Sequence, residues 1–295
     1  MKVLRIISGF FLFCIASLNV LAQESAELVQ EPSAKSNFKE LGKTFYDTRI
    51  VNGQSVETNN EGVMKFIIAH RFGTVNGGAY ELFGLDQSTI RIGFDYGISD
   101  RLSVGIGRSS NEKTFDGFLK YKILQQASEG APLSLVYYGN IAARGLDWPN
   151  DSLSREFKHR LFYTHQLLLA CKFSDRFSAQ LMPSFLHRNL VSSGQKNDIV
   201  SIGSAARYVA TKSLTFSFEY YYALPDMLTD DFKNSLAIGI DWETKGHVFS
   251  FHLGNSLGMT EKFFIGETRG SWSEGDIRIG FNITRDFKIK GRKER

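Results

Sequence analysis

Hydrophobic side chains recur at every second position along most of this chain. Residues 88–110 read STIRIGFDYGISDRLSVGIGRSS, with isoleucine, phenylalanine or tyrosine at each even position from 90 to 98 and small, polar or charged residues between them. A period of two is typical of a β-strand with one apolar and one polar face. The pattern raises the question of whether the apolar face contacts a protein core or the lipid of a membrane.

The same alternation predicts about twelve strands over residues 63–287. Strands of soluble proteins usually have about five or six residues, whereas a strand that crosses a bilayer needs about 9–11. The predicted strands have the longer length. They are 63–72, 88–98, 101–109, 113–124, 132–142, 157–173, 177–189, 198–210, 214–224, 235–243, 247–255 and 276–287.

The connections between these strands alternate between short and long. Short ones include 99–101, 174–176 and 211–213, and the long ones include 73–87 and 256–275. Outer-membrane barrels have short periplasmic turns and long external loops, whereas a sandwich with Greek-key crossings has no reason to alternate in this way. We therefore predict an all-β fold, an antiparallel up-and-down transmembrane β-barrel of about twelve strands. The alternative is a soluble exported β-sandwich that acts as a binding protein.

The polar face of the predicted barrel carries charges of both signs. Every backbone group in hydrocarbon must be paired internally, so the sheet closes and this face lines a lumen. Two interpretations are open: a constriction that selects solutes by charge, or salt bridges that close the bore. The candidate lumen-lining residues are Arg91, Asp95, Asp116, Lys120, Arg160, Arg207, Glu219, Asp241 and Arg278.

The ends of the chain predict export. Lys2 and Arg5 precede an apolar run that ends at Ala22, which is the order of a cleaved signal peptide over residues 1–22. Residues 23–62 are predicted as a disordered leader and a pre-barrel arm. The arm, 38–62, either folds into the bore as a plug or contacts a periplasmic partner. Residues 288–295 form a basic tail that we place in the periplasm.

Composition narrows the function further. The net charge of +4 is small and the Lys and Arg residues are dispersed, so we predict no nucleic-acid partner. Cys171 is the only cysteine after residue 22, so an intrachain disulfide is excluded there. Twenty-five Phe and 11 Tyr against five Pro favour strands over disorder.

No cluster of residues predicts a cofactor or a metal site with any strength. Gly254 to Gly258 match G-x-S-x-G, but no helical pattern follows, and the nucleophile elbow needs one. Ser250, His252 and Ser256 are the residues that a membrane-embedded lipid hydrolase would use, and we keep that as an alternative. The six histidines are dispersed, and His165 with His187 is the pair nearest to a metal site.

Four segments resemble an uncharacterised outer-membrane β-barrel family of Bacteroidetes, a domain of unknown function. They are TRIVNGQSVET (48–58), HRFG (70–73), GAYELFGLDQSTIRIGFDYGISDRLSVGIGRSS (78–110) and KTFDGFLKYKIL (113–124). The resemblance is dense over residues 45–124 and looser afterwards. It implies export and an outer-membrane barrel, and it supplies no reaction, substrate or active residue.

The expected location is therefore the outer membrane after removal of the signal peptide, with lipid around the barrel. The expected function is a narrow, porin-like channel or binding barrel for a small solute, without catalysis and without a cofactor. A structural or docking barrel that binds a periplasmic or surface protein is the main alternative.

Overall fold

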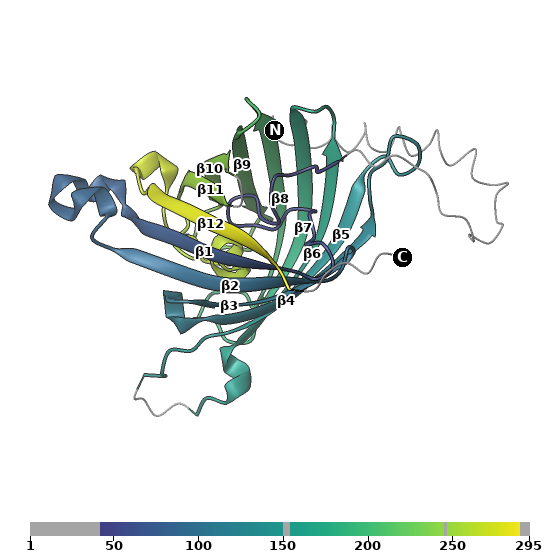
Figure 1. Ribbon diagram of the computed structural model, residues 1–295. Helices are drawn as coiled ribbons and strands as arrows, with labels where there is room; N and C mark the ends of the chain where they lie inside the picture. Colours follow the sequence, from purple (N-terminus) through teal and green to yellow (C-terminus); the bar gives the residue numbers. More distant parts are fainter. Residues whose placement is uncertain (1–41, 150–153, 245–246, 290–295) are drawn as a thin grey trace.

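The described residues form one closed antiparallel barrel of twelve strands. The computed structural model describes residues 42–149, 154–244 and 247–289. The predicted signal peptide (1–22), the start of the leader and residues 290–295 of the tail lie outside these ranges. Each strand pairs with the next one in the chain, and β12 pairs with β1 to close the barrel (Figure 1). The predicted fold class is confirmed.

The strands lie within a few residues of their predicted positions. The largest difference is at the start of β6, where residues 157–160 form a 3₁₀ turn instead of strand. The strands are β1 (Val63–Thr74), β2 (Ser88–Ser99), β3 (Leu102–Ser109), β4 (Phe115–Leu124), β5 (Ser134–Ala143), β6 (Leu161–Lys172), β7 (Phe177–Arg188), β8 (Asp198–Val209), β9 (Leu214–Ala223), β10 (Ser235–Glu243), β11 (Val248–Gly254) and β12 (Arg278–Lys288).

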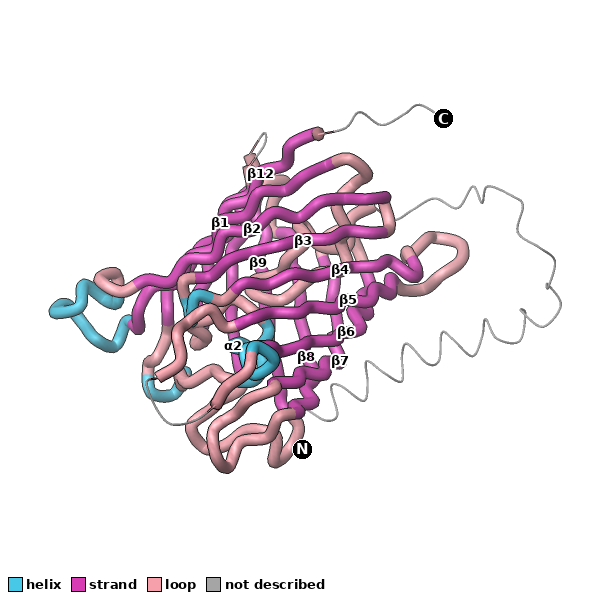
Figure 2. Tube along the Cα trace, turned by 90° about the horizontal axis from the view of Figure 1, so that it is seen from below, coloured by secondary structure: helices cyan, strands magenta, loops and turns pink. Residues whose placement is uncertain are grey.

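The two ends of the barrel differ in their connections. The short turns, such as those between β6 and β7 and between β8 and β9, lie at one end, which we call the turn end. The long connections lie at the other, the loop end. They contain η2 (Val75–Gly84), η3 (Asn111–Lys113), η4 (Phe157–Arg160), α2 (Glu261–Gly266) and η5 (Trp272–Glu274). Figure 2 views the barrel from the loop end, where α2 lies among the loops.

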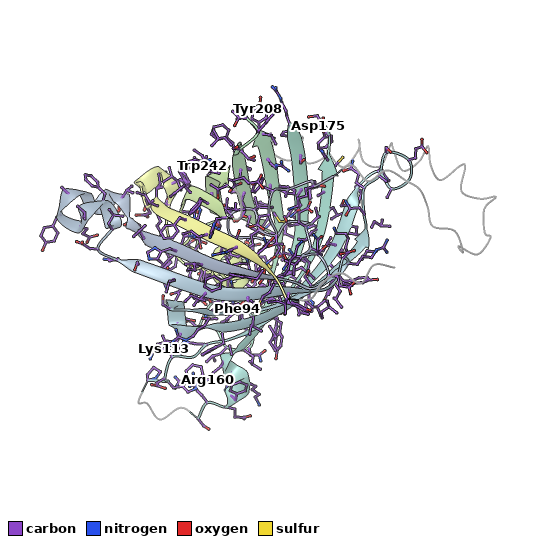
Figure 3. The ribbon with its side chains drawn as sticks, in the orientation of Figure 1. Phe94, Lys113, Arg160, Asp175, Tyr208 and Trp242 are labelled. Carbon is purple, nitrogen blue, oxygen red and sulfur yellow. The ribbon has the colours of Figure 1, made fainter. Side chains whose placement is uncertain are left out.

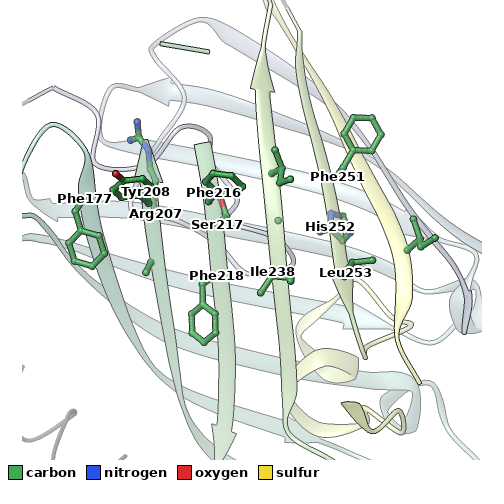
Figure 4. A pocket seen from close by; sticks show the side chains of 14 residues that line it. Phe177, Arg207, Tyr208, Phe216, Ser217, Phe218, Ile238, Phe251, His252 and Leu253 are labelled. Carbon is green, nitrogen blue, oxygen red and sulfur yellow. The ribbon is translucent and has the colours of Figure 1, made fainter. Parts of the chain in front are cut away.

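Side chains alternate between the outer surface and the interior along each strand. On β2, Phe94 is 43% exposed, whereas its neighbour Asp95 is 1% exposed. Figure 4 shows the outer face of β8 to β11, where Phe216, Phe218 and Ile238 line an apolar surface groove of about 610 Å³. Such a continuous exposed apolar face is unfavourable in water and matches the hydrocarbon of a bilayer.

Aromatic side chains concentrate on the outer surface at the turn end. Tyr208 and Trp242 are 47% and 55% exposed and lie near the last residues of β8 and β10. Phe173 and Phe177 flank the β6–β7 turn and stack with ring centres 5.8 Å apart. Figure 3 shows Tyr208 and Trp242 toward the end opposite Arg160. Aromatic rings at this level are the girdle that anchors a barrel at a membrane interface.

Candidate functional site

The interior of the barrel is the candidate site, and most of the predicted lumen residues lie there. Eight of them occupy inward-facing strand positions, the last of these at the first residue of β12. They are Arg91, Asp95, Asp116, Lys120, Arg207, Glu219, Asp241 and Arg278. The remaining candidate, Arg160, is the last residue of η4 and lies among the loops. Its strand begins one residue later, because residues 157–160 form a 3₁₀ turn with a capping box between Glu156 and His159.

One pair of the predicted residues forms a buried salt bridge across β3. The Arg91 Nε donates to Asp116 Oδ1 at 2.9 Å and the Arg91 Nη2 to Asp116 Oδ2 at 2.5 Å. Each side chain is 2% exposed. The paired fork geometry satisfies both charges inside the wall.

The arm, residues 42–62, fills the lumen from the turn end. Its tip is held by Glu219, whose carboxylate accepts the backbone amides of Val51 (3.1 Å), Asn52 (3.2 Å) and Gly53 (2.9 Å). A Cβ at Gly53 would overlap the Tyr221 hydroxyl, so the tip fits closely against β9. Three adjacent amides around one carboxylate form an anion-binding nest in which the protein's own Glu219 is the anion.

The sides of the arm are bound by other inward side chains. Lys120 Nζ donates to the carbonyls of Thr48 (2.9 Å) and Glu57 (3.0 Å). Gln180 accepts the Val56 amide at 2.9 Å and donates to the Gln54 carbonyl at 2.7 Å. These bonds satisfy backbone groups that would otherwise be buried and unpaired in an irregular segment.

Three more wall residues bind the arm. Arg71 Nη2 donates to Asn52 Oδ1 at 2.9 Å, and Asn282 Nδ2 donates to the Val51 carbonyl at 2.9 Å. Lys65 lies 2.8 Å from the Asp47 carboxylate. With Gln180, these residues were not among the sequence candidates, although their positions in the alternation already place them on the inward face.

The loop between β11 and β12 enters the barrel from the opposite end and carries α2. All six residues of α2 are buried. The Phe264 ring lies 5.0 Å from the Tyr221 ring, and the Tyr138 hydroxyl donates to Glu261 Oε1 at 2.6 Å. Because Tyr221 also lies against Gly53, the arm and α2 approach each other at this residue.

Two acidic groups on these segments have shifted pKa values. Burial by itself would raise the pKa of Asp47, but the Lys65 ammonium and the Thr284 hydroxyl outweigh burial and hold the pKa below its usual 3.8. Burial raises the pKa of Glu261 above its usual 4.5, although the Tyr138 hydrogen bond opposes the rise. The environment therefore stabilises the ionised form of Asp47 in the arm and destabilises the ionised form of Glu261 in α2.

The residues of the hydrolase alternative are not joined in this structure. The Ser256 hydroxyl donates to the Gly258 carbonyl at 3.1 Å, and Ser250 shares a hydrogen bond with Asp241. His252 is 5% exposed, and neither ring nitrogen has a hydrogen-bond partner. A serine nucleophile needs a histidine base within hydrogen-bond reach.

The histidine pair is also separate. His165 binds the Tyr137 hydroxyl at 2.7 Å, and His187 binds the Asp198 carboxylate at 2.6 Å. Within the described ranges, no three His, Cys, Asp or Glu side chains gather as metal ligands would. In the same ranges, no helix is long and apolar enough to cross a membrane.

Closure of the sheet, the apolar outer face and the aromatic girdle together define a membrane-bound β-barrel. The chain belongs to the family described as membrane bound beta barrel domain (DUF5777), whose pattern matches residues 45–287. The match includes most of the arm as well as the barrel. No curated protein sequence matches the chain.

Several solved barrels have a similar course of the chain. The NanC porin has a TM-score of 0.47 at 9% identity, over 77% of this chain and 100% of its own. An outer membrane channel of Pseudomonas putida F1 has a TM-score of 0.46 at 13% identity, over 79% and 98%. Outer membrane phospholipase A from Escherichia coli has a TM-score of 0.43 at 9% identity, over 75% and 92%. Channels and an enzyme both occur at this level of likeness, so a shared function does not follow from it.

Proposed function

We propose that the protein is a gated outer-membrane channel for a small solute, in which the arm is the gate. The observation that carries this proposal is the seat of the arm, whose tip amides are bound by a charged lumen residue, Glu219, at 2.9–3.2 Å. Among the described residues, the arm continues into the barrel at β1, so the arm can leave the lumen without any change in the strand pairing of the barrel.

The wall behind the arm is suited to a wet bore. The inward charges include Lys120 and Arg207 as well as Asp95 and Glu219, so the wall carries both cations and anions. Burying such charges against an apolar plug would cost free energy, whereas water and a polar solute would solvate them. In the closed state the backbone of the arm takes the place of that water.

The outer membrane is the bilayer that fits this architecture. Barrels with short turns at one end and long loops at the other have the turns in the periplasm. On this basis the arm enters from the periplasm and α2 from outside the cell. We also infer that the protein catalyses no covalent step, since Ser250 and Ser256 bond to other groups and the ring nitrogens of His252 bond to neither serine.

Conductance across planar bilayers tests the gate. The wild type, a variant lacking residues 44–58, a variant with a Gly-Ser linker in place of residues 258–268, and the double variant are compared at equal protein insertion. We expect the wild type to be closed and the arm deletion to raise conductance by at least about tenfold. The double variant shows whether the α2 loop adds a second constriction in series.

Two outcomes would overturn the proposal. A large resting conductance in the wild type would mean that the arm does not close the bore. No conductance in the double variant, despite a folded and heat-modifiable barrel, would mean that the protein is a structural or docking barrel.

A further inference from the structure

A second feature, a basic cavity, lies at the loop end, apart from the arm. The cavity has a volume of about 490 Å³ and is lined by residues of the loops that follow β3, β5, β7, β9 and β11. Its volume is within the range of sites that enclose a small molecule, and it is too small to enclose a folded partner. Arg160, the one sequence candidate that does not lie in the lumen, lines this cavity.

Cations outnumber anions in this cavity. Apart from Arg155, five Arg or Lys side chains and two carboxylates line it among the described residues, a balance of 5 − 2 = +3. The carboxylates, Glu112 and Glu267, are already engaged. Glu112 lies 2.6 Å from Lys262 and 3.6 Å from Arg144, and Glu267 lies 2.8 Å from Arg188. Arg155 aside, the described lining therefore carries a net positive charge.

Three of these cations surround one indole ring. The guanidinium carbons of Arg144, Arg155 and Arg160 lie 5.0, 5.2 and 4.7 Å from the centre of the Trp148 ring. Arg160 also donates to the carbonyls of residues 144 and 146, which fix its direction. Stacking on the indole holds the guanidinium groups close together, and an anion that binds beside Arg144 and Arg160 would reduce the repulsion between their like charges.

The floor of the cavity is built from buried charges. Arg188, at the end of β7, is 2% exposed, and Lys262, on α2, is 8% exposed. Both point inside the mouth of the barrel, away from the outer face that contacts lipid. A lipid headgroup at the membrane surface would not reach them, whereas a soluble ligand would.

We propose that this cavity, formed by Trp148, Arg144, Arg160, Arg188 and Lys262, binds a small soluble organic anion with two or more carboxylate or phosphate groups. Guanidinium forks recognise such groups through paired hydrogen bonds, and the buried Lys262 adds a point charge at the floor. The site goes beyond the gate: binding requires only the loop end and does not require that the arm leaves the lumen.

Calorimetric titration of the full chain in neutral detergent tests the site. The probes are citrate and pyrophosphate, with glucose as an uncharged control. We expect both anions to bind, glucose not to bind, and the affinity for the anions to fall as NaCl is raised. Arg160→Gln and Arg188→Gln should each weaken binding by at least about tenfold, the effect of one charge-assisted hydrogen bond.

Arg108→Gln is the matched control, since Arg108 also stacks on a ring, that of Phe115, but on the exposed surface of β3. It should leave the affinity within about twofold of the wild type. Absence of binding by both anions would overturn the proposal, as would equal affinities in wild type, Arg160→Gln and Arg188→Gln. Binding of phosphatidylglycerol bicelles but of neither soluble anion would also overturn it. Anion binding by a protein that never conducts would refute the gate alone.

Discussion

The arm and the α2 loop fill the same lumen from opposite ends, but different forces hold them. The backbone of the arm is bound by charged and polar wall residues such as Glu219, Lys120 and Gln180. Its apolar side chains also lie in the hydrophobic core; they are Phe45, Ile50, Val51 and Val56. The α2 segment is bound through apolar side chains, with Phe264 0% and Ile265 2% exposed. Both segments therefore bury apolar side chains, but the irregular backbone of the arm also depends on wall hydrogen bonds, which water can replace.

The attachment of the two segments to the barrel differs in the same direction. The arm continues into β1 at one end only, whereas the α2 loop is fixed between β11 and β12. A segment with one attachment can leave the lumen without breaking a connection between strands, although withdrawal of the arm would also expose its buried apolar side chains. A segment with two attachments and an apolar face acts as a fixed part of the wall. We therefore expect the arm to move and α2 to remain a fixed part of the lumen.

The largest effect that this comparison predicts is at α2. Phe264→Ala removes a fully buried ring that packs on Tyr221, and we expect a loss of about 3–5 kcal/mol in the free energy of unfolding. The measurement is the temperature at which the folded band disappears in SDS gels. Phe157→Ala is the control, because Phe157 is 69% exposed at the loop end and its loss should cost under about 0.5 kcal/mol. Equal losses in both variants would show that α2 is not a packed part of the barrel.

A substitution at Glu219 should loosen the arm without lowering the stability of the barrel. Glu219→Ala leaves the amides of Val51, Asn52 and Gly53 without their acceptor, a cost of about 2–4 kcal/mol to the seated arm. We expect hydrogen exchange at these three amides to become about 100-fold faster, while the barrel strands keep their protection.

Glu219→Gln sharpens this test because it keeps one acceptor oxygen at the same place. It should give an intermediate rate of exchange. Unchanged exchange in Glu219→Ala would mean that the nest does not hold the arm, and global loss of protection would mean that the arm belongs to the core.

The two regions also differ in how well they could be predicted. Strand positions were predictable because alternation repeats within each strand and turn residues mark its ends, so β8 and β9 begin at Asp198 and Leu214 as expected. The inward side of each strand followed from the same pattern. What an inward residue binds did not follow, because Val51 and Glu219 are 168 residues apart and no periodicity relates them.

The segments inside the lumen were harder to predict for a physical reason. The α2 helix has six residues, too few to show a helical period, and the buried Phe263 and Phe264 read as an ordinary loop. The arm was recognised as a segment before the barrel, with the plug as one of two interpretations, but nothing in its sequence marks Gly53 as its tip. Arg160 was assigned to a strand that begins one residue later.

A smaller effect is expected from the hydrogen bond between Tyr138 and Glu261 of α2. Tyr138→Phe removes the hydroxyl that donates to Glu261 at 2.6 Å and leaves a buried carboxyl group without this partner. We expect a loss of about 1–2 kcal/mol, measured by the same gel shift. Tyr137→Phe is the matched control on the same strand, because its hydroxyl bonds to His165 on the exposed face. A larger loss in Tyr137→Phe than in Tyr138→Phe would contradict the role of Glu261 in seating α2.

The smallest effect is a response to pH, and it should have opposite signs in the two regions. The pKa of Glu261 is raised above 4.5 in the folded protein, so its contribution favours folding at low pH and is lost as pH rises through the raised value. The pKa of Asp47 is held below 3.8, so its contribution is present above 3.8 and is lost as pH falls through the lowered value. Acidification from neutral pH through the raised pKa of Glu261, ending no lower than about pH 4.5, should therefore slow hydrogen exchange in α2, after correction for the intrinsic rate, and leave the arm unchanged. Glu261→Gln should abolish the change in α2, because the variant has no proton to take up there.

Faster exchange in α2 on acidification would reverse the sign for Glu261, and release of the arm in the same pH range would remove the distinction between the two segments.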